Sequence, residues 1–252
     1  MSAVAISPNG SYVLTGSDDH SVRLWKIGSE AGGPRPIVLS GHEGPIRNAS
    51  FNSDGTIAMS LSDDSARLWD GRDGRSIGAP RHGKKMHAAT FSVDGRRIAT
   101  AADDGTVRIW ESFSGREIKS IPVSGEPLCL AFNDQGDRLL VGTRQSECKC
   151  FDVDGGRQIG ASLKGHDDAI VSVAFMPNGS RVITASRDST VRLWDPVHGE
   201  EMHVIKDAKN PYYRVWVTPD SRRIFELTET GTVFTWDSEP ERRDSPALGG
   251  LR

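Results

Sequence analysis

The chain has 252 residues, and its 31 Lys and Arg residues against 34 Asp and Glu residues give a formal net charge of -3. That balance lacks the overall basic field with which proteins hold nucleic acid or anionic lipid. No eighteen apolar residues run together, and the first ten residues lack the basic and apolar segments of a secretory signal. We therefore expect a cytoplasmic protein that binds neither nucleic acid nor membrane.

The cysteines support the same compartment. Their number is odd, and Cys148 and Cys150 fall on one face of a predicted strand, which indicates free buried thiols together with Cys129. A zinc site at Cys148 and Cys150 requires two further ligands at suitable spacing, which the sequence does not offer. We expect no metal and no cofactor.

One block of sequence recurs six times along the chain. The common pattern is an apolar strand, a tight turn that is Asn-Gly or Asp-Gly in four of the blocks, a second strand, an acidic turn and a third strand that ends in an aromatic residue. A period of this length indicates a repeat architecture, so function is expected on a repeated surface. The blocks end at Trp25, Trp69, Trp110, Phe151, Trp194 and Trp236. Their bounds are about 1–40, 41–81, 82–122, 123–164, 165–207 and 208–237.

Within each block the residue pattern predicts β-strands. The third segments, such as Thr190-Val-Arg-Leu-Trp194, alternate with period two, as half-buried strands do. Asp54-Gly55 and Asp94-Gly95 supply the positive φ angles of tight hairpin turns. Residues 116–121 and 201–205 read as outer strands, giving four strands per block. Helical repeats of similar period need two long amphipathic helices per unit, which these turn-rich blocks cannot form.

Several motifs in these blocks resemble the WD40-repeat family. Gly165-His166 precedes Trp194 by 28 residues, with Asp188 six before that Trp, and Trp194 is followed by Asp195. The resemblance implies an all-β fold in one domain over residues 1–252. That fold is a β-propeller of about six four-stranded WD40-type blades around a central channel.

The resemblance also implies a buried polar network in each blade. In that family the Trp indole N–H reaches a Ser hydroxyl, the Ser reaches His, and the His reaches Asp. In the third block Ala102 stands where the hydroxyl is expected. The residues assigned to this structural network are Ser17, Asp19, Trp25, His42, Ser62, Asp64, Trp69, His82, Asp104, Trp110, His166, Ser186, Asp188 and Trp194.

The residue types of the network are also those of a nucleophilic triad. Two observations favour the structural interpretation over catalysis. The set recurs in several blocks, and none of its serines stands in a Gly-x-Ser-x-Gly turn or beside a Gly-rich phosphate loop. We therefore expect no catalytic residue, and labelling of Ser186 by a serine-reactive probe would contradict this.

Blocks four and six depart from the pattern. Block four has Phe151 for Trp, Gln145 for the turn Asp and Val123 at the His position, while block six has Ala208 at the His position and Thr230 in its turn. Both blocks are expected to be held mainly by packing and to be locally less stable than block five.

The ends of the chain determine how a ring would close. The chain opens in an innermost strand and ends after the third strand of block six, and residues 238–252 form either a poorly ordered tail or a weak outer strand. A closed ring of six blades is one arrangement. The alternatives are an incomplete ring and a piece of a longer protein, and an open edge would favour self-association.

Partner binding is expected on one face of the ring. In WD40 propellers the loops before each innermost strand and the turns between second and third strands form this face. Here they carry charges of both signs, which suits a polypeptide partner. The residues assigned to partner binding are His20, Lys84, Lys85, Met86, Arg144, Asp167, Asp168, Arg187, Tyr212, Tyr213 and Arg214. Trp216, at a position that other blocks give to small residues, either fills space in its own blade or anchors a partner.

Three functional classes follow from these features. The first is a non-catalytic scaffold or adaptor module that binds proteins or peptides through its faces. The second is a sensor or recruitment segment of a larger signalling protein whose catalytic domain lies outside this chain. The third, disfavoured by the network argument, is a propeller hydrolase.

Overall fold

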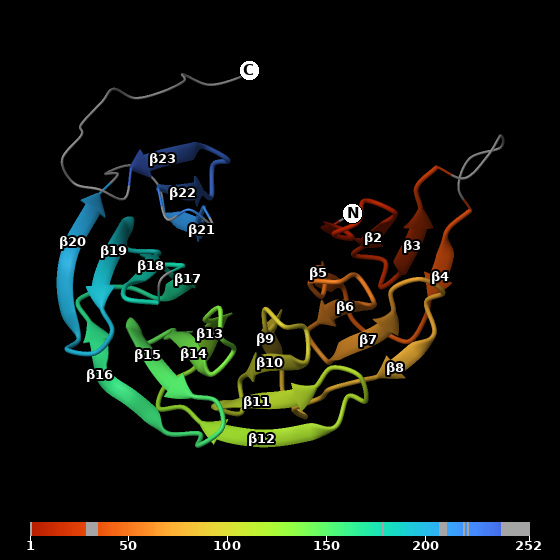
Figure 1. Ribbon diagram of the computed structural model, residues 1–252, viewed down its shortest axis with the longest axis horizontal. Helices are drawn as coiled ribbons and strands as arrows, with labels where there is room; N and C mark the ends of the chain where they lie inside the picture. Colours follow the sequence, from red (N-terminus) through yellow and green to blue (C-terminus); the bar gives the residue numbers. More distant parts are fainter. Residues whose placement is uncertain are drawn as a thin grey trace. The chain divides into compact units, whose positions relative to one another are not determined.

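A computed structural model describes residues 2–28, 35–177, 179–206, 211–218, 220 and 222–237. Among these residues all regular structure is β-strand, and the strands form six antiparallel sheets (Figure 1). The chain divides into two compact units, residues 1–127 and 128–252. Ala208 and the tail predicted at 238–252 lie outside the described residues.

The first unit holds three four-stranded sheets in which strands consecutive in sequence are neighbours in the sheet. The first sheet consists of β1 (Ala3–Ile6), β2 (Tyr12–Gly16), β3 (Val22–Lys26) and β4 (Ile37–Leu39). The second consists of β5 (Ile46–Phe51), β6 (Ile57–Ser62), β7 (Ala66–Asp70) and β8 (Ser76–Gly78). The third consists of β9 (Met86–Phe91), β10 (Arg97–Ala102), β11 (Thr106–Glu111) and β12 (Glu117–Pro122).

The second unit repeats this order, and its first strand begins at the unit boundary. One sheet consists of β13 (Pro127–Phe132), β14 (Arg138–Thr143), β15 (Glu147–Asp152) and β16 (Gln158–Lys164). The next consists of β17 (Ile170–Phe175), β18 (Val182–Ser186), β19 (Thr190–Asp195) and β20 (Glu200–Lys206). The last has three described strands, β21 (Tyr212–Val217), β22 (Arg223–Thr228) and β23 (Val233–Asp237).

The hairpins follow from local turn chemistry. Gly55 and Gly95 adopt φ angles of 73° and 69°, a left-handed conformation that residues with a Cβ rarely adopt. The carboxylate of Asp54 accepts the backbone N–H of Thr56 at 2.8 Å, which closes the turn from β5 to β6. Each predicted block therefore folds into one sheet, and the all-β prediction with four-stranded repeats is confirmed.

Apolar side chains between neighbouring sheets of a unit make the core. In the first unit Leu14, Ile46 and Trp69 belong to one buried cluster that joins the first two sheets. The approach is close enough that a Cβ on Gly16 would lie 2.3 Å from Cγ2 of Ile46. In the second unit Cys129 and Trp194 belong to a comparable cluster between the sheets of β13–β16 and β17–β20. The sheets of each unit are thus held by interdigitated side chains.

Irregular pairing recurs between the third and fourth strands. The register shifts next to Trp69, Trp110 and Trp194 and, in the sheet of β13–β16, between Cys148 and Cys150. Such β-bulges increase the local twist of a strand pair. No register shift occurs in the three residue pairs that join β3 to β4.

Among the described residues, no helix is long and apolar enough to cross a membrane. How the ring closes stays a prediction.

Candidate functional site

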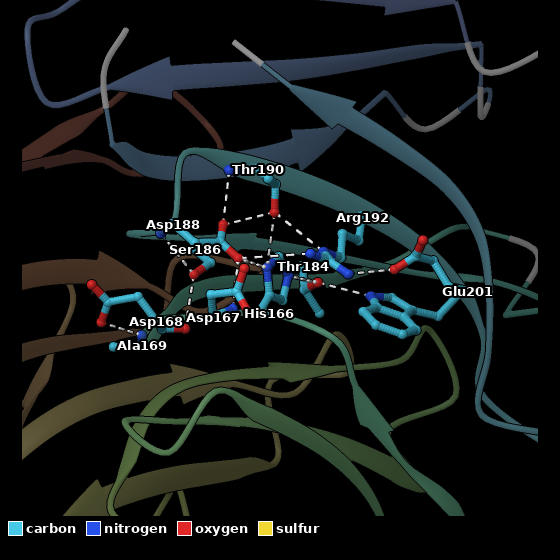
Figure 2. Close-up of polar contacts among 11 residues, drawn as sticks. His166, Asp167, Asp168, Ala169, Thr184, Ser186, Asp188, Thr190, Arg192 and Glu201 are labelled. Atoms are coloured by element: carbon cyan, nitrogen blue, oxygen red, sulfur yellow. Dashed lines mark hydrogen bonds and ion pairs between the residues drawn. The ribbon is translucent and has the colours of Figure 1, made fainter. Parts of the chain in front are cut away.

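The sheet of β17–β20 contains a continuous chain of buried hydrogen bonds (Figure 2). The indole N–H of Trp194 donates to Oγ1 of Thr184 at 2.8 Å, and this hydroxyl lies 2.7 Å from Nε2 of His166. On the other side of the ring, Nδ1 of His166 lies 2.8 Å from Oδ2 of Asp188. All donors and acceptors are matched if the Thr184 hydroxyl donates to Nε2 and the neutral imidazole carries its proton on Nδ1.

The network hydroxyl belongs to Thr184, so the assignment of this role to Ser186 is wrong. In the register of β18 with β19, Trp194 lies opposite Val182, and Thr184 is its diagonal neighbour two residues further along β18. Diagonal neighbours are within reach of a long aromatic side chain, whereas Ser186 lies two residues further still. Ser186 instead donates to the carbonyl of Asp168 at 2.8 Å and accepts the backbone N–H of Asp188 at 3.1 Å.

Further polar groups surround the carboxylate of Asp188 (Figure 2). Thr190 donates its hydroxyl at 2.7 Å, and the backbone N–H of Asp167 donates at 3.0 Å. Burial raises the pKa of Asp188, but these hydrogen bonds and the contact with His166 outweigh it, so the pKa lies below its ordinary value. Arg192 lies 4.0 Å from the same carboxylate and also binds Glu201 on β20, which extends the network to the outer strand.

The sheet of β9–β12 contains the same network. The indole of Trp110 donates to Thr100 at 2.7 Å, and Nε2 of His82 lies 2.7 Å from the same hydroxyl. Nδ1 of His82 lies 3.0 Å from a carboxylate oxygen of Asp104. The expectation that this block lacks the hydroxyl, because Ala102 occupies its place, is therefore wrong, since Thr100 supplies it.

In the sheet of β5–β8 the network has an extra link. Trp69 donates to Ser60 at 2.9 Å, and His42 lies 2.7 Å from Ser60 through Nε2 and 2.9 Å from Ser62 through Nδ1. The Ser62 hydroxyl in turn donates to Asp64, whose carboxylate is 4.0 Å from His42. The acidic turn is one residue shorter here, and a serine bridges the gap. Ser62 is thus a network member, although Trp69 binds Ser60.

The sheet of β1–β4 keeps only part of the network. Trp25 donates to Thr15 at 2.9 Å, which is again the hydroxyl on the strand opposite. Asp19 accepts the backbone N–H of Ser21 at 3.0 Å, and its own N–H points to Ser17 at 3.4 Å. Ser17 and Asp19 therefore shape the turn, and the Trp25 indole is hydrogen-bonded to Thr15 rather than to either of them.

Burial sets the protonation of the network histidines. Desolvation lowers the pKa of His42 to about 4, against the opposing pull of the Asp64 carboxylate. Burial likewise lowers the pKa of His82 and His166 below the ordinary value, and the carboxylates of Asp104 and Asp188 oppose it. The three imidazoles are neutral at physiological pH, as the hydrogen-bond pattern requires.

This arrangement is suited to holding strands together and not to nucleophilic attack. The hydroxyl of Ser186 is fully buried, and its hydrogen-bond partners are the backbone carbonyl of Asp168 and the backbone N–H of Asp188 rather than His166. The hydroxyl that does contact His166, that of Thr184, is also fully buried and already accepts the Trp194 indole. A nucleophile requires an approachable oxygen beside a base.

Sequence reasoning missed the hydroxyls that accept the indoles, although a signal was present. Each precedes its Trp by nine or ten residues and lies on the strand face that the tryptophan shares. These residues are Thr15, Ser60, Thr100 and Thr184. In block four the corresponding position holds Val141 beside Phe151, and in block six it holds the buried Glu226.

The loops predicted to bind a partner are exposed at most positions. In the first unit His20, Lys84 and Lys85 are exposed, but Met86 is 2% exposed and belongs to the core cluster between β5–β8 and β9–β12. Assigning Met86 to partner binding is therefore wrong. It is the first residue of β9 and pairs with Ala102, and its side chain points inward as that of Ile46 does in β5.

In the second unit the predicted loop residues are also exposed. They are Arg144, Asp167, Asp168, Arg187 and Arg214. Tyr212 and Tyr213 are the first two residues of β21. The structure brings Asp168 and Arg187 near each other, because the N–H of Arg187 donates to the carbonyl of Ala169 at 3.0 Å. These loops are tied by backbone bonds to the ends of rigid strands.

Trp216 makes a defined contact within its own sheet. Its ring stacks on that of Phe225 in the neighbouring strand, with centroids 5.5 Å apart and planes 6° from parallel. The side chain is still 39% exposed. The contact favours the interpretation in which Trp216 fills space in the last sheet.

The cysteines behave as expected from their number. Cys129, Cys148 and Cys150 are buried and unpaired, and burial raises the pKa of Cys129 to about 12 and that of Cys150 to about 11. Thiols with such pKa values are neutral and unreactive at physiological pH.

Comparison with known proteins identifies the family. The model of the IFT122 first beta-propeller family matches residues 1–237, which is nearly the whole chain. The chain belongs to this family. The resemblance to WD40-repeat propellers is thereby confirmed, and the repeated sheets and Trp networks of this IFT122-type propeller are the features expected of such blades.

Relatives of the propeller are distant and longer. The chain is 24% identical to the chicken serine-threonine kinase receptor-associated protein over 79% of its own length and 55% of that protein's. It is 26% identical to the fission-yeast periodic tryptophan protein 2 homolog, over 96% of this chain and 26% of that protein. It is 26% identical to zebrafish apoptotic protease-activating factor 1, over 91% of this chain and 18% of that protein. The chain thus spans about half or less of the relatives' length.

Proposed function

We propose that this chain is a non-catalytic scaffold module, a single propeller domain that binds protein or peptide partners through the loops at the ends of its strands. The match of one propeller family model to residues 1–237 supports a single domain. The chicken relative is named for association with a receptor kinase, which fits a binding role.

The proposal rests on a contrast between the polar side chains inside the sheets and those in the loops. The His, Ser, Thr and Asp side chains that resemble a catalytic triad are hydrogen-bonded to one another in the Trp networks, whereas the loop residues are exposed and their backbone is hydrogen-bonded to neighbouring strands and turns. In the first unit the N–H of Asp103 donates to the carbonyl of Lys85 at 2.8 Å, and in the second Arg187 donates to Ala169. Rigid exposed loops on strand ends are suited to recognition at a low entropic cost.

The charges of these loops suggest the class of partner. Nζ of Lys85 lies 3.8 Å from the carboxylate of Asp63, and the exposed Arg187 lies in the turn that is bonded to the loop of Asp167 and Asp168. Charges of both signs at short spacing complement a polypeptide better than a polyanion such as nucleic acid. The buried free thiols support a reducing compartment, so we place the protein in the cytoplasm.

A recruitment role within a larger protein is the second candidate. It is favoured by the relatives, because the zebrafish relative, named for activating a protease, extends far beyond the matched part. In that case the exposed loops would serve a neighbouring domain or its ligand, and catalysis would lie outside this chain.

The test is affinity capture from cell extract with the chain as bait. We expect a variant with Lys84, Lys85, Arg187 and Tyr213 replaced by Ala to lose partners that the native chain retains. The matched control replaces Arg75, Arg116 and Arg157, which are exposed and recur in the turns between third and fourth strands. Equal partner sets for the native chain and the loop variant would contradict the proposal. Serine-reactive probes should leave Ser186 unlabelled in the folded chain.

A further inference from the structure

Three side chains from different segments of the first unit meet beside β9. His87 lies on β9, Asp103 follows β10, and Glu126 precedes β13. Nε2 of His87 is hydrogen-bonded to Oδ1 of Asp103 and lies 3.5 Å from Oε1 of Glu126. One ligand atom from each residue lies within 4.8 Å of the others. We call these residues the His87 triad.

The neighbouring sheet has the same construction with the opposite charge. Arg47 occupies the second position of β5 as His87 does in β9, Asp63 follows β6, and Lys85 directly precedes β9. Nε of Arg47 lies 3.4 Å and Nζ of Lys85 lies 3.8 Å from the carboxylate of Asp63. This Arg47 triad therefore surrounds one carboxylate with two permanent cations.

The His87 triad reverses this balance. It holds two carboxylates and one imidazole, which is a cation only when protonated. The hydrogen bond from His87 is the main reason that the pKa of Asp103 lies below its ordinary value, and Lys85 adds to this effect. At neutral pH the triad carries an excess of negative charge, while the Arg47 triad carries an excess of positive charge.

We propose that the His87 triad binds a divalent transition-metal ion of the zinc class. A zinc ion takes imidazole nitrogen and carboxylate oxygen ligands at about 2.0–2.2 Å, which places the ligand atoms of a tetrahedral site roughly 3.3 Å apart. The 3.5 Å between His87 and Glu126 is close to that spacing, and the side chains of Asp103 and Glu126 are 37% and 28% exposed, so they have room to adjust. A water molecule completes the coordination.

The donor set selects among cations. Magnesium and calcium prefer all-oxygen sites with six or more ligands, whereas an imidazole favours zinc, cobalt and nickel. The metal takes the lone pair of Nε2 of His87, so the proton that this nitrogen donates to Asp103 in the metal-free chain moves to Nδ1, and at low pH protons compete with the metal for the ligand atoms. The expected order is therefore tight binding of zinc and cobalt, little binding of calcium, and weaker binding as the pH falls.

The experiment uses the whole chain after treatment with a chelator. Titration calorimetry with zinc chloride should show one bound equivalent, and cobalt chloride should give visible absorption bands of a site with nitrogen and oxygen ligands. H87Q and E126Q should each weaken zinc binding by about tenfold or more. The matched control is D63N in the Arg47 triad, which should leave the zinc affinity unchanged.

Three outcomes would overturn the proposal. They are no zinc or cobalt binding by the native chain, zinc binding that survives both H87Q and E126Q, and equal loss in D63N. Exposed His198, which binds Asp195 at 2.9 Å, is the chief competing site, and H198Q shows whether it accounts for the signal. E126Q alters a loop residue outside the strands, so it carries the test if H87Q does not fold. The cobalt spectrum of the native chain needs no variant.

Discussion

The sheets of β13–β16 and β17–β20 have the same strand order, and their second and third strands pair in the same register, yet equivalent positions in the two sheets hold polar residues in one and apolar residues in the other. Trp194 and Thr184 make a hydrogen bond in one, whereas Phe151 and Val141 occupy these positions in the other and are buried. The His position holds His166 in the first and Val123 in the second. In the sheet of β13–β16 the Trp, Thr and His of the network are all replaced by apolar residues. No network donor or acceptor is therefore left without its partner there.

This comparison separates the cost of breaking a network from its net contribution. Removing one partner of a buried hydrogen bond costs about 1–3 kcal/mol, but replacing both with apolar groups of similar shape is nearly neutral. The network therefore mainly fixes side-chain positions. Its absence from block four does not by itself imply a lower free energy of unfolding for that block. The expectation that block four is less stable than block five stays a prediction.

Block four also has its own polar cluster. Lys149 occupies the position of Arg192, and its side chain is 6% exposed. It lies 3.2 Å from Glu147, which Lys164 of β16 approaches at 2.9 Å. Both sheets thus connect a largely buried basic side chain of the third strand to an acidic group and to the outer strand, but through different residues.

The largest effect is expected from T184V. Valine keeps the shape of threonine but leaves the indole N–H of Trp194 and Nε2 of His166 buried without the hydroxyl. Two such losses should lower the free energy of unfolding by roughly 2–4 kcal/mol, measured by urea denaturation. V141T places a hydroxyl beside Phe151 and should cost about 1–2 kcal/mol. A cost below about 1 kcal/mol for T184V would show that the network adds little even when broken.

Acid should weaken the sheets that contain network histidines. Burial lowers the pKa of His42 to about 4, so the unfolded chain binds a proton at a higher pH than the folded chain does. Stability is therefore complete above about pH 6.5 and falls as the pH drops toward 4. Solvent near Asp64 screens part of this effect, and on the order of 2 kcal/mol is expected for His42.

The measurement is urea denaturation at several pH values, with hydrogen exchange resolved for β18 and β14. After correction for intrinsic exchange, protection in β18 should fall with acid more than in β14, because His166 has no counterpart in the apolar sheet. H42Q should reduce the pH dependence of the unfolding free energy. Equal losses in β14 and β18 would assign the acid effect to other groups.

The smallest effect is expected from S186A. Ser186 accepts the N–H of Asp188 and donates to the carbonyl of Asp168, so its loss affects one turn and leaves the Trp194 hydrogen bond intact. About 1 kcal/mol or less is expected by the same denaturation assay. If S186A cost more than T184V, Ser186 and not Thr184 would be the important hydroxyl.

The sequence alone predicts the strands and repeats well, since period-two alternation and Asp-Gly turns are local signals. It predicts the network less well, because the residue that meets Trp194 depends on which residue of β18 lies opposite it. The sequence pattern assigns the hydroxyl to Ser186, which stands next to the acidic turn. The pairing of β18 with β19 shows that the hydroxyl near Trp194 is that of Thr184. Met86 was misassigned for a similar reason, since a strand's first residue can equally well belong to the preceding loop.

The His87 triad was beyond prediction from the repeat pattern. His87 and Asp103 come from one block and Glu126 from the next, and none of the three stands at a position where the WD40 resemblance implies a role. Only the pairing of β9 with β10 and the path of the loop before β13 bring them together. The nearest signal in the sequence is a comparison of successive blocks, in which Arg47 and Asp63 stand at the positions that His87 and Asp103 occupy in the next block.

The bulges between the third and fourth strands have a consequence for aggregation. A strongly twisted outer edge is a poor template for the strand of another molecule, so β8, β12, β16 and β20 resist edge-to-edge stacking. β4 pairs without a bulge and exposes Ile37 and Val38, but it is only three residues long. The short length of β4, rather than a bulge, therefore limits its pairing with a strand of another molecule. Lengthening β4 with apolar residues would create an aggregation-prone edge strand.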